Sequence, residues 1–241
     1  MNLYRYSCNG VITPSVSTIL KSDSKYKTYR QSLGASSAFN TRKDIQARQR
    51  GVEVHSAARK FLRTGEVDLP EQYFPYWNNI YKSLALLEPR DVLWADGPNV
   101  EKLQHLQQGE HSAVWNSKYK YCGCPDFVAK CNGVSVLGEF KTSDTLFDST
   151  YKMNFHEYGS FFKYHQASMQ LAGYVKAFEQ TTGIRIDAGV IIVGTPSDSQ
   201  LFILEKPQLK KALTKFHKLA RDFHKADSFV QPQSAKELAA V

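Results

Sequence analysis

The spacing of apolar residues predicts three helices in the first part of the chain. A short helix begins at a capping residue within 13–15 and places Val16 and Ile19 on one apolar face. A longer helix covers residues 44–65 and ends at a glycine. A third helix covers residues 71–87, just before a proline. Apolar residues recur in these segments at the spacing of helices with one buried face.

After these helices the pattern changes to short runs of β-branched and aromatic residues bounded by turns, which are typical of strands. The runs cover residues 91–96, 111–116, 126–131, 134–142, 188–195 and 201–205. A helix over 161–180 separates the fourth run from the fifth, and an amphipathic helix over 208–226 follows the last. This order predicts an α/β fold with a central mixed β-sheet flanked by helices and a helical N-terminal region.

We interpret residues 1–241 as a single domain, because the chain has no repeat, no low-complexity run and no long linker. Its first part, 1–90, is expected to be mainly helical. The sheet with its inserted helix occupies 91–205, and a basic C-terminal helix and tail occupy 206–241.

Composition and charge narrow the class of protein. The chain has 31 Lys and Arg against 23 Asp and Glu, a formal net charge of +8, which favours a polyanionic partner. No run approaches the roughly 18 apolar residues of a membrane helix, and the first residues lack the apolar segment of a secretory signal. Four cysteines are too few for a disulfide framework, and their spacing is not that of a zinc site. We therefore expect a cytoplasmic protein with no membrane partner and no cysteine-bound metal.

The strongest local signal is Asn132-Gly133, which predicts a two-residue type I′ turn because both residues accept positive φ. Counting back from this turn places Asp126 directly opposite Glu139, with Lys141 on the same face as Glu139. The other face of the hairpin is apolar, and we expect it to lie in the core. Its residues are Phe127, Ala129, Cys131, Val134, Val136, Gly138 and Phe140.

Two opposed carboxylates repel each other unless a cation lies between them. Oxygen ligands favour a hard ion, so Asp126 and Glu139 predict a Mg²⁺ or Mn²⁺ site to which the backbone carbonyl of Phe140 could add a ligand. Lys141 would orient a water molecule and stabilise negative charge on a phosphate. The alternative is a surface hairpin whose charges are only solvated.

The segments Cys124-Pro125-Asp126 and Gly138-Glu139-Phe140-Lys141-Thr142-Ser143 resemble the motif of the PD-(D/E)XK nuclease superfamily. The wider resemblance is to its RecB-like exonuclease branch, which includes mitochondrial genome maintenance and phage enzymes. Four further segments match that branch in the expected order, at residues 14–20, 50–55, 121–123 and 170–174.

The resemblance implies a central mixed sheet flanked by helices, with Asp126 and Glu139 as metal ligands and Lys141 as the catalytic lysine. It also implies that His55 approaches the metal from its helix. A lone helical histidine is otherwise more often structural. At the place where the family often carries a glutamate, this chain has His111, which is either a further ligand or a solvated residue.

Substrate contacts are expected on two further helical segments. The resemblance implies that Gln170 and Tyr174 shape the site or hold a DNA strand. Basic residues surround the predicted site histidine, and we expect phosphate contacts from Arg48, Arg50 and Arg59. Some relatives hold an iron–sulfur cluster with cysteines after the helix of Gln170, but this chain has none there.

Together these observations predict a metal-dependent DNA exonuclease that hydrolyses phosphodiester bonds. We expect it to act on single-stranded DNA or DNA ends in replication, repair or recombination, and a phage origin would suit it. A structure-specific or single-strand endonuclease on the same core is one alternative. A non-catalytic DNA-binding module is another. The polarity of digestion and the oligomeric state stay open.

Overall fold

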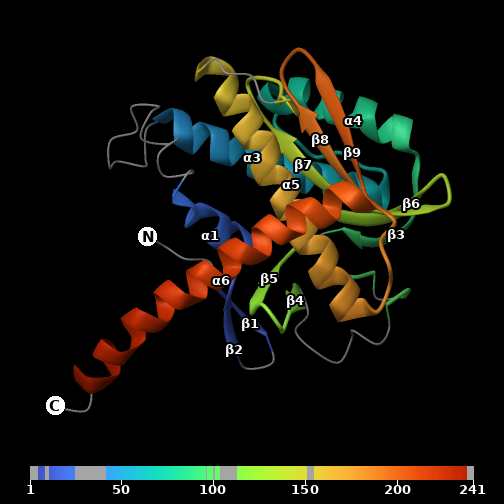
Figure 1. Ribbon diagram of the computed structural model, residues 1–241. Helices are drawn as coiled ribbons and strands as arrows, with labels where there is room; N and C mark the ends of the chain where they lie inside the picture. The colour runs from blue at the N-terminus through green and yellow to red at the C-terminus, as the bar shows by residue number, and fades with distance from the viewer. Residues whose placement is uncertain are drawn as a thin grey trace.

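A five-stranded mixed sheet forms the centre of the computed structural model (Figure 1). The structure describes residues 5–8, 11–24, 42–95, 97–99, 101–103, 113–150 and 155–237. The strand order is β3-β6-β7-β8-β9, and the neighbours are antiparallel except for the parallel pair β7 and β8. The strands are β3 (Pro89–Ala95), β6 (Phe127–Cys131), β7 (Val134–Thr142), β8 (Ala188–Gly194) and β9 (Ser199–Glu205).

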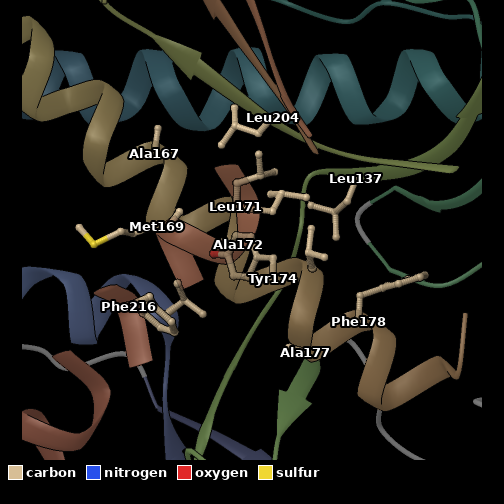
Figure 2. Packing of buried hydrophobic residues seen from close by; sticks show 14 of the residues in the cluster. Leu137, Ala167, Met169, Leu171, Ala172, Tyr174, Ala177, Phe178, Leu204 and Phe216 are labelled. Atoms are coloured by element: carbon tan, nitrogen blue, oxygen red, sulfur yellow. The ribbon is translucent and has the colours of Figure 1, made fainter. Parts of the chain in front are cut away.

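Helices cover both faces of this sheet, which confirms the predicted α/β fold. One face packs against α3 (Arg42–Thr64) and α4 (Phe74–Leu87), which follows the short 3₁₀ turn η1 (Glu71–Tyr73). The other face packs against α5 (Phe155–Thr182) and α6 (Lys206–Glu237), and the short helix α1 (Val16–Lys21) packs on these two helices. Each layer buries its own apolar cluster. Figure 2 shows the α5-side cluster, which includes Leu137 of β7, Leu171 of α5 and Phe216 of α6.

The hairpin of β6 and β7 has the predicted register. Cys131 pairs with Val134 and Phe127 with Gly138, and both turn residues, Asn132 and Gly133, have positive φ. The apolar face lies against α3 and α4 as expected, except that Val134 is 41% exposed at the turn. The prediction missed that the opposite face is also core. A sheet covered on both sides buries both faces of its central strands.

Several boundaries differ from the prediction. The N-terminal part contains a hairpin of β1 (Arg5–Cys8) and β2 (Val11–Pro14) that the sequence did not indicate, and β5 (Tyr121–Gly123) was also missed. β5 pairs with β4 (Val114–Asn116) in a small separate sheet. The helices α5 and α6 begin earlier than predicted, and α6 continues well beyond residue 226. The missed strands β1, β2 and β5 have only three or four residues, which is too few to show a clear alternation of apolar and polar side chains.

The start of α1 follows the predicted cap. Ser15 is the N-cap, and its Oγ accepts a hydrogen bond from the backbone N–H of Thr18 at 3.0 Å. Within the part of the chain that the structure describes, no helix has the length and apolar content needed to cross a bilayer.

Candidate active site

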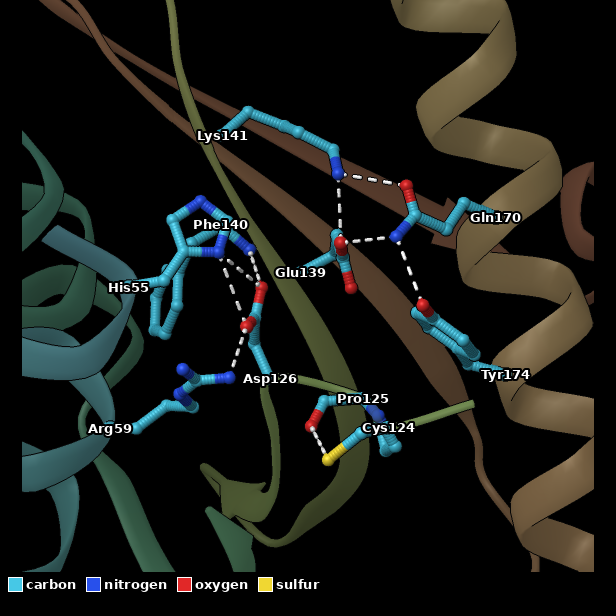
Figure 3. Close-up of polar contacts among 10 residues, drawn as sticks. All are labelled: His55, Arg59, Cys124, Pro125, Asp126, Glu139, Phe140, Lys141, Gln170 and Tyr174. Carbon is cyan, nitrogen blue, oxygen red and sulfur yellow. Dashed lines mark hydrogen bonds and ion pairs between the residues drawn. The ribbon is translucent and has the colours of Figure 1, made fainter. Parts of the chain in front are cut away.

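Asp126 and Glu139 come together where β6 begins and β7 passes beside it. Asp126 lies one residue before the first pair of the β6–β7 ladder, and Glu139 lies one residue beyond the partner of that pair. Their side chains are buried, with only 4% and 3% of each residue exposed. Figure 3 shows that residues of α3 approach the pair from one side and residues of α5 from the other.

Asp126 is held by one backbone N–H and two side chains of α3. The N–H of Phe140 donates to Asp126 Oδ2 at 2.8 Å. His55 Nδ1 lies 3.2 Å from Oδ2, and Arg59 Nη1 lies 3.5 Å from Oδ1. Burial by itself would raise the pKa of Asp126, but the interactions with His55, Arg59 and Lys141 outweigh it and hold the pKa below its usual value. Asp126 is therefore kept ionised.

Glu139 has a different set of partners. Its Oε1 accepts hydrogen bonds from Lys141 Nζ at 2.8 Å and from Gln170 Nε2 at 2.7 Å. Gln170 Oε1 also accepts from Lys141 Nζ at 2.8 Å, and Gln170 Nε2 donates to the Tyr174 hydroxyl at 3.1 Å (Figure 3). Burial raises the pKa of Glu139 to about 7; Lys141 opposes this rise and the negative charge of Asp126 adds to it.

The second carboxylate oxygen of Glu139 is the unusual atom in this site. Among the described residues, Oε2 is buried and has no hydrogen-bond partner. A buried carboxylate oxygen without a partner costs free energy, and such an atom is expected to have a ligand. The described residues contain no group of three or more His, Cys, Asp and Glu side chains arranged for a metal. Two carboxylates fit Mg²⁺ nevertheless, because this ion usually keeps several waters and needs few protein ligands.

The position of Tyr174 depends on a glycine in β5. A Cβ atom on Gly123 would lie 2.4 Å from Cε1 of Tyr174, closer than real contacts allow. The ring of Tyr174 therefore occupies the space that a side chain at Gly123 would need. With the ring in this place, the Tyr174 hydroxyl accepts a hydrogen bond from the amide of Gln170. The close approach of the Tyr174 ring explains why the segment 121–123 ends in a residue without a side chain.

The three arginines predicted to contact phosphate lie in different places on α3. Arg59 contacts Asp126. Arg50 Nη1 donates to Asp144 Oδ1 at 2.7 Å and to the Tyr76 hydroxyl at 2.8 Å. Arg48 is exposed, and its charge acts with burial to lower the pKa of Lys21, so it lies towards α1. Arg59 thus contacts Asp126, Arg50 contacts Asp144 at the end of β7, and Arg48 lies on the surface.

Sequence reasoning missed a cluster at the end of β7. Asp144 and Tyr76 hold Arg50, and Lys163 of α5 donates to Ser143 Oγ at 3.2 Å. Lys163 precedes Gln170 by two helical turns, a spacing that could have pointed to it. His111 and the glutamate before it lie outside the described residues.

Comparisons with known proteins give little beyond this geometry. No protein-family model matches the chain, and no curated protein matches it. A crystal structure of a protein named "Putative exonuclease" from Eubacterium rectale has a TM-score of 0.43 and 13% identity, covering 85% of this chain and 77% of that one. The structure of SSO0001 has a TM-score of 0.26 and 17% identity, covering 86% and 83%. At these TM-scores the likeness does not identify a function.

Proposed function

We propose that this protein is a metal-dependent DNA exonuclease that hydrolyses phosphodiester bonds in single-stranded DNA or at DNA ends. The observation that carries the proposal is the buried Oε2 of Glu139, which has no hydrogen-bond partner among the described residues, beside the carboxylate of Asp126, whose pKa is lowered. The lysine that bonds to the other oxygen of Glu139 adds a cation to the same place. The activity would serve DNA replication, repair or recombination.

Asp126 and Glu139 would hold the cation, with the backbone carbonyl of Phe140 as a further ligand. A bound Mg²⁺ or Mn²⁺ would supply Lewis-acid stabilisation of the phosphate and make water more acidic. His55 and Arg59 serve the site by keeping Asp126 in its charged form. Burial raises the pKa of Glu139 and makes its charge unfavourable, and a bound cation would relieve that cost.

Lys141 is positioned for the chemical step by two hydrogen bonds. Its ammonium donates to Glu139 Oε1 and Gln170 Oε1, which holds it next to the Glu139 carboxylate. In the reaction it orients the attacking water and stabilises the charge that grows on the phosphate. The amide oxygen of Gln170 accepts a hydrogen bond from Lys141, and its NH₂ group donates to Glu139 and Tyr174. One amide therefore holds both Lys141 and Glu139 in place.

The test uses DNA labelled at either end, as single and double strands, together with closed single-stranded circles. Wild-type protein is incubated with Mg²⁺, Mn²⁺ or EDTA, beside Asp126→Asn and the control Glu205→Gln. Glu205 is an exposed carboxylate on β9, so the control makes the same kind of change away from the site. We expect stepwise loss of linear DNA with metal, none with EDTA, none with Asp126→Asn, and full activity for the control.

Other outcomes separate the alternatives. Cleavage of circles would favour a single-strand or structure-specific endonuclease. Binding without cleavage under all metal conditions would favour a non-catalytic DNA-binding module. Cleavage that survives EDTA, or survives Asp126→Asn, would contradict the proposed metal chemistry.

A further inference from the structure

Lys163 of α5 is a partly buried cation near the end of β7. Its ammonium donates to Ser143 Oγ at 3.2 Å. Among the residues that the structure describes, no carboxylate oxygen lies within ion-pair distance of this ammonium. Burial, together with the charge of Arg50, lowers the pKa of Lys163. Holding a charged ammonium there without a carboxylate is unfavourable, and a bound anion would remove that cost.

A second cation reaches the same place from the other side of the sheet. Arg50 of α3 has a side chain only 13% exposed, and its guanidinium lies 4.3 Å from the ring centre of Tyr76. Its carboxylate partner, Asp144, is 71% exposed at the end of β7. Asp144 also acts on Lys163, since its charge opposes the lowering of the lysine pKa. Asp144 therefore pairs directly with Arg50 and acts on Lys163 only from a longer distance, so the cluster of two cations and one carboxylate keeps an excess positive charge.

Ser143, the strand residue of this cluster, lies on the same face of the chain as Glu139 and Lys141 of β7. Glu139, Lys141 and Ser143 are successive residues of one face, because the backbone N–H of Ser143 still bonds to the carbonyl of Gly194 and extends the pairing with β8. One step of two residues along a strand covers about 6.6 Å, comparable with the distance between neighbouring phosphates of an extended single strand.

The helix α5 follows β7 in the opposite direction and supplies one side chain at each step. Gln170 of α5 bonds to Lys141 and Glu139, and Lys163, two turns earlier on α5, bonds to Ser143. The contact between β7 and α5 is therefore repeated two residues further along the chain. At the proposed reaction site Lys141 contacts Gln170, and at the next position Ser143 contacts the cation Lys163.

We propose that Lys163 and Arg50 form a second phosphate site, in which Ser143 holds the lysine, and that this site binds the phosphodiester next to the one that is cleaved. This inference rests on the proposed function, since the scissile phosphate is taken to lie at Glu139 and Lys141. The ligand is the sugar–phosphate backbone of a DNA strand, recognised by charge and not by base. The site fixes the register of the strand, so that a linkage lies at the carboxylates.

The first measurement is DNA binding in EDTA, where no cleavage is expected. A fluorescent single-stranded oligonucleotide is titrated by anisotropy across a range of NaCl with wild type, Lys163→Met and the control Lys130→Met. Lys130 is an exposed lysine near the hairpin turn, so the control removes the same charge elsewhere. One phosphate contact on single-stranded DNA contributes about 0.7 to the slope of log K against log [NaCl]. We expect Lys163→Met to lose about that much and Lys130→Met to keep the wild-type slope.

The second measurement changes the DNA and leaves the protein intact. Neutral methylphosphonates replace single phosphates on either side of the cleaved linkage, and cleavage is followed with Mg²⁺. We expect one neighbouring replacement to raise the KM of the wild type about tenfold, the usual effect of one charge-assisted hydrogen bond, with kcat little changed. The same replacement should not weaken Lys163→Met further, because that variant has already lost the contact.

Two outcomes would overturn the inference while the proposed function stands: an unchanged salt slope for Lys163→Met, or additive effects of the variant and the methylphosphonate. Wild-type protein that binds DNA but never cleaves it would contradict the proposed function, and the salt slope would still decide the phosphate site. Wild-type protein that does not bind DNA would refute both.

Discussion

Glu139→Gln separates a residue that binds a cation from one that stabilises the fold. Glu139 is 3% exposed, and its pKa of about 7 compares with 4.5 for an ordinary glutamate. This difference corresponds to about 3 kcal/mol of instability when the side chain is charged and no metal is bound. Glutamine has the same shape, keeps an oxygen for Lys141 and Gln170, and carries no charge to bury. We therefore expect the variant to be the more stable protein without metal.

The sign follows from the raised pKa. Below pH 4.5 Glu139 is protonated in the folded and unfolded chains and carries no cost. As pH rises towards 7, the unfolded chain releases the proton first, so the wild type loses stability over that interval. Glutamine does not titrate, so the variant's advantage should be small at pH 4.5 and complete at pH 8.

Thermal unfolding in EDTA at pH 4.5 and pH 8 measures this difference. For a chain of this length, 1 kcal/mol shifts the melting temperature by about 2–4 °C, so the variant should melt up to about 6–12 °C above the wild type at pH 8. Adding Mg²⁺ should raise the melting temperature of the wild type and leave Glu139→Gln unchanged, because only the wild type retains both carboxylates. Glu205→Gln should behave as the wild type in every condition.

One result would refute this reasoning. If Glu139→Gln melts well below the wild type at pH 8 in EDTA, then Glu139 stabilises the fold through its charge. The orphaned Oε2 would then be a structural feature, and the proposed cation site would lose its main support.

Three further predictions concern single residues around the site and beyond it. Lys141→Ala should leave Mg²⁺ binding intact in calorimetry but lower kcat by about 10²–10³-fold; loss of Mg²⁺ binding would contradict the role given to the lysine. Gly123→Ala should displace Tyr174 and cost about 1–3 kcal/mol of stability in urea unfolding, whereas wild-type stability would mean that the ring moves freely. His217 has a pKa lowered to about 4 by burial and nearby cations, so stability should fall as pH drops from 6.5 towards 4. His217→Gln should reduce that fall, and an unchanged pH profile would show that another group causes it.

Local sequence determined the hairpin that carries both carboxylates. Asn132 and Gly133 accept the positive φ that a type I′ turn requires, and the turn sets which residues pair across β6 and β7. Because side chains alternate along a strand, the same count places Glu139 and Lys141 on one face. No information from distant parts of the chain was needed for these positions.

Sequence also indicated the helices, because their apolar spacing continues over several turns. It was less informative for the short strands β1, β2 and β5, where three or four residues do not establish a period. It also predicted one buried face for the β6–β7 hairpin, although Val128 and Leu137 bury the other face as well. Whether a second layer of helices covers a sheet depends on the packing of the whole chain.

Only the tertiary structure decided how charge is divided between the two carboxylates. Asp126 is kept ionised by His55 and Arg59 from α3, whereas Glu139 faces Gln170 of α5 and has a raised pKa. The two helices pack on opposite faces of the sheet. Each one's rotation about its axis is set by burial of its whole apolar face, which no local motif specifies. The meeting of Lys163 with Ser143 has the same origin, since the strand and the helix fix each side chain separately and only their packing brings the two together.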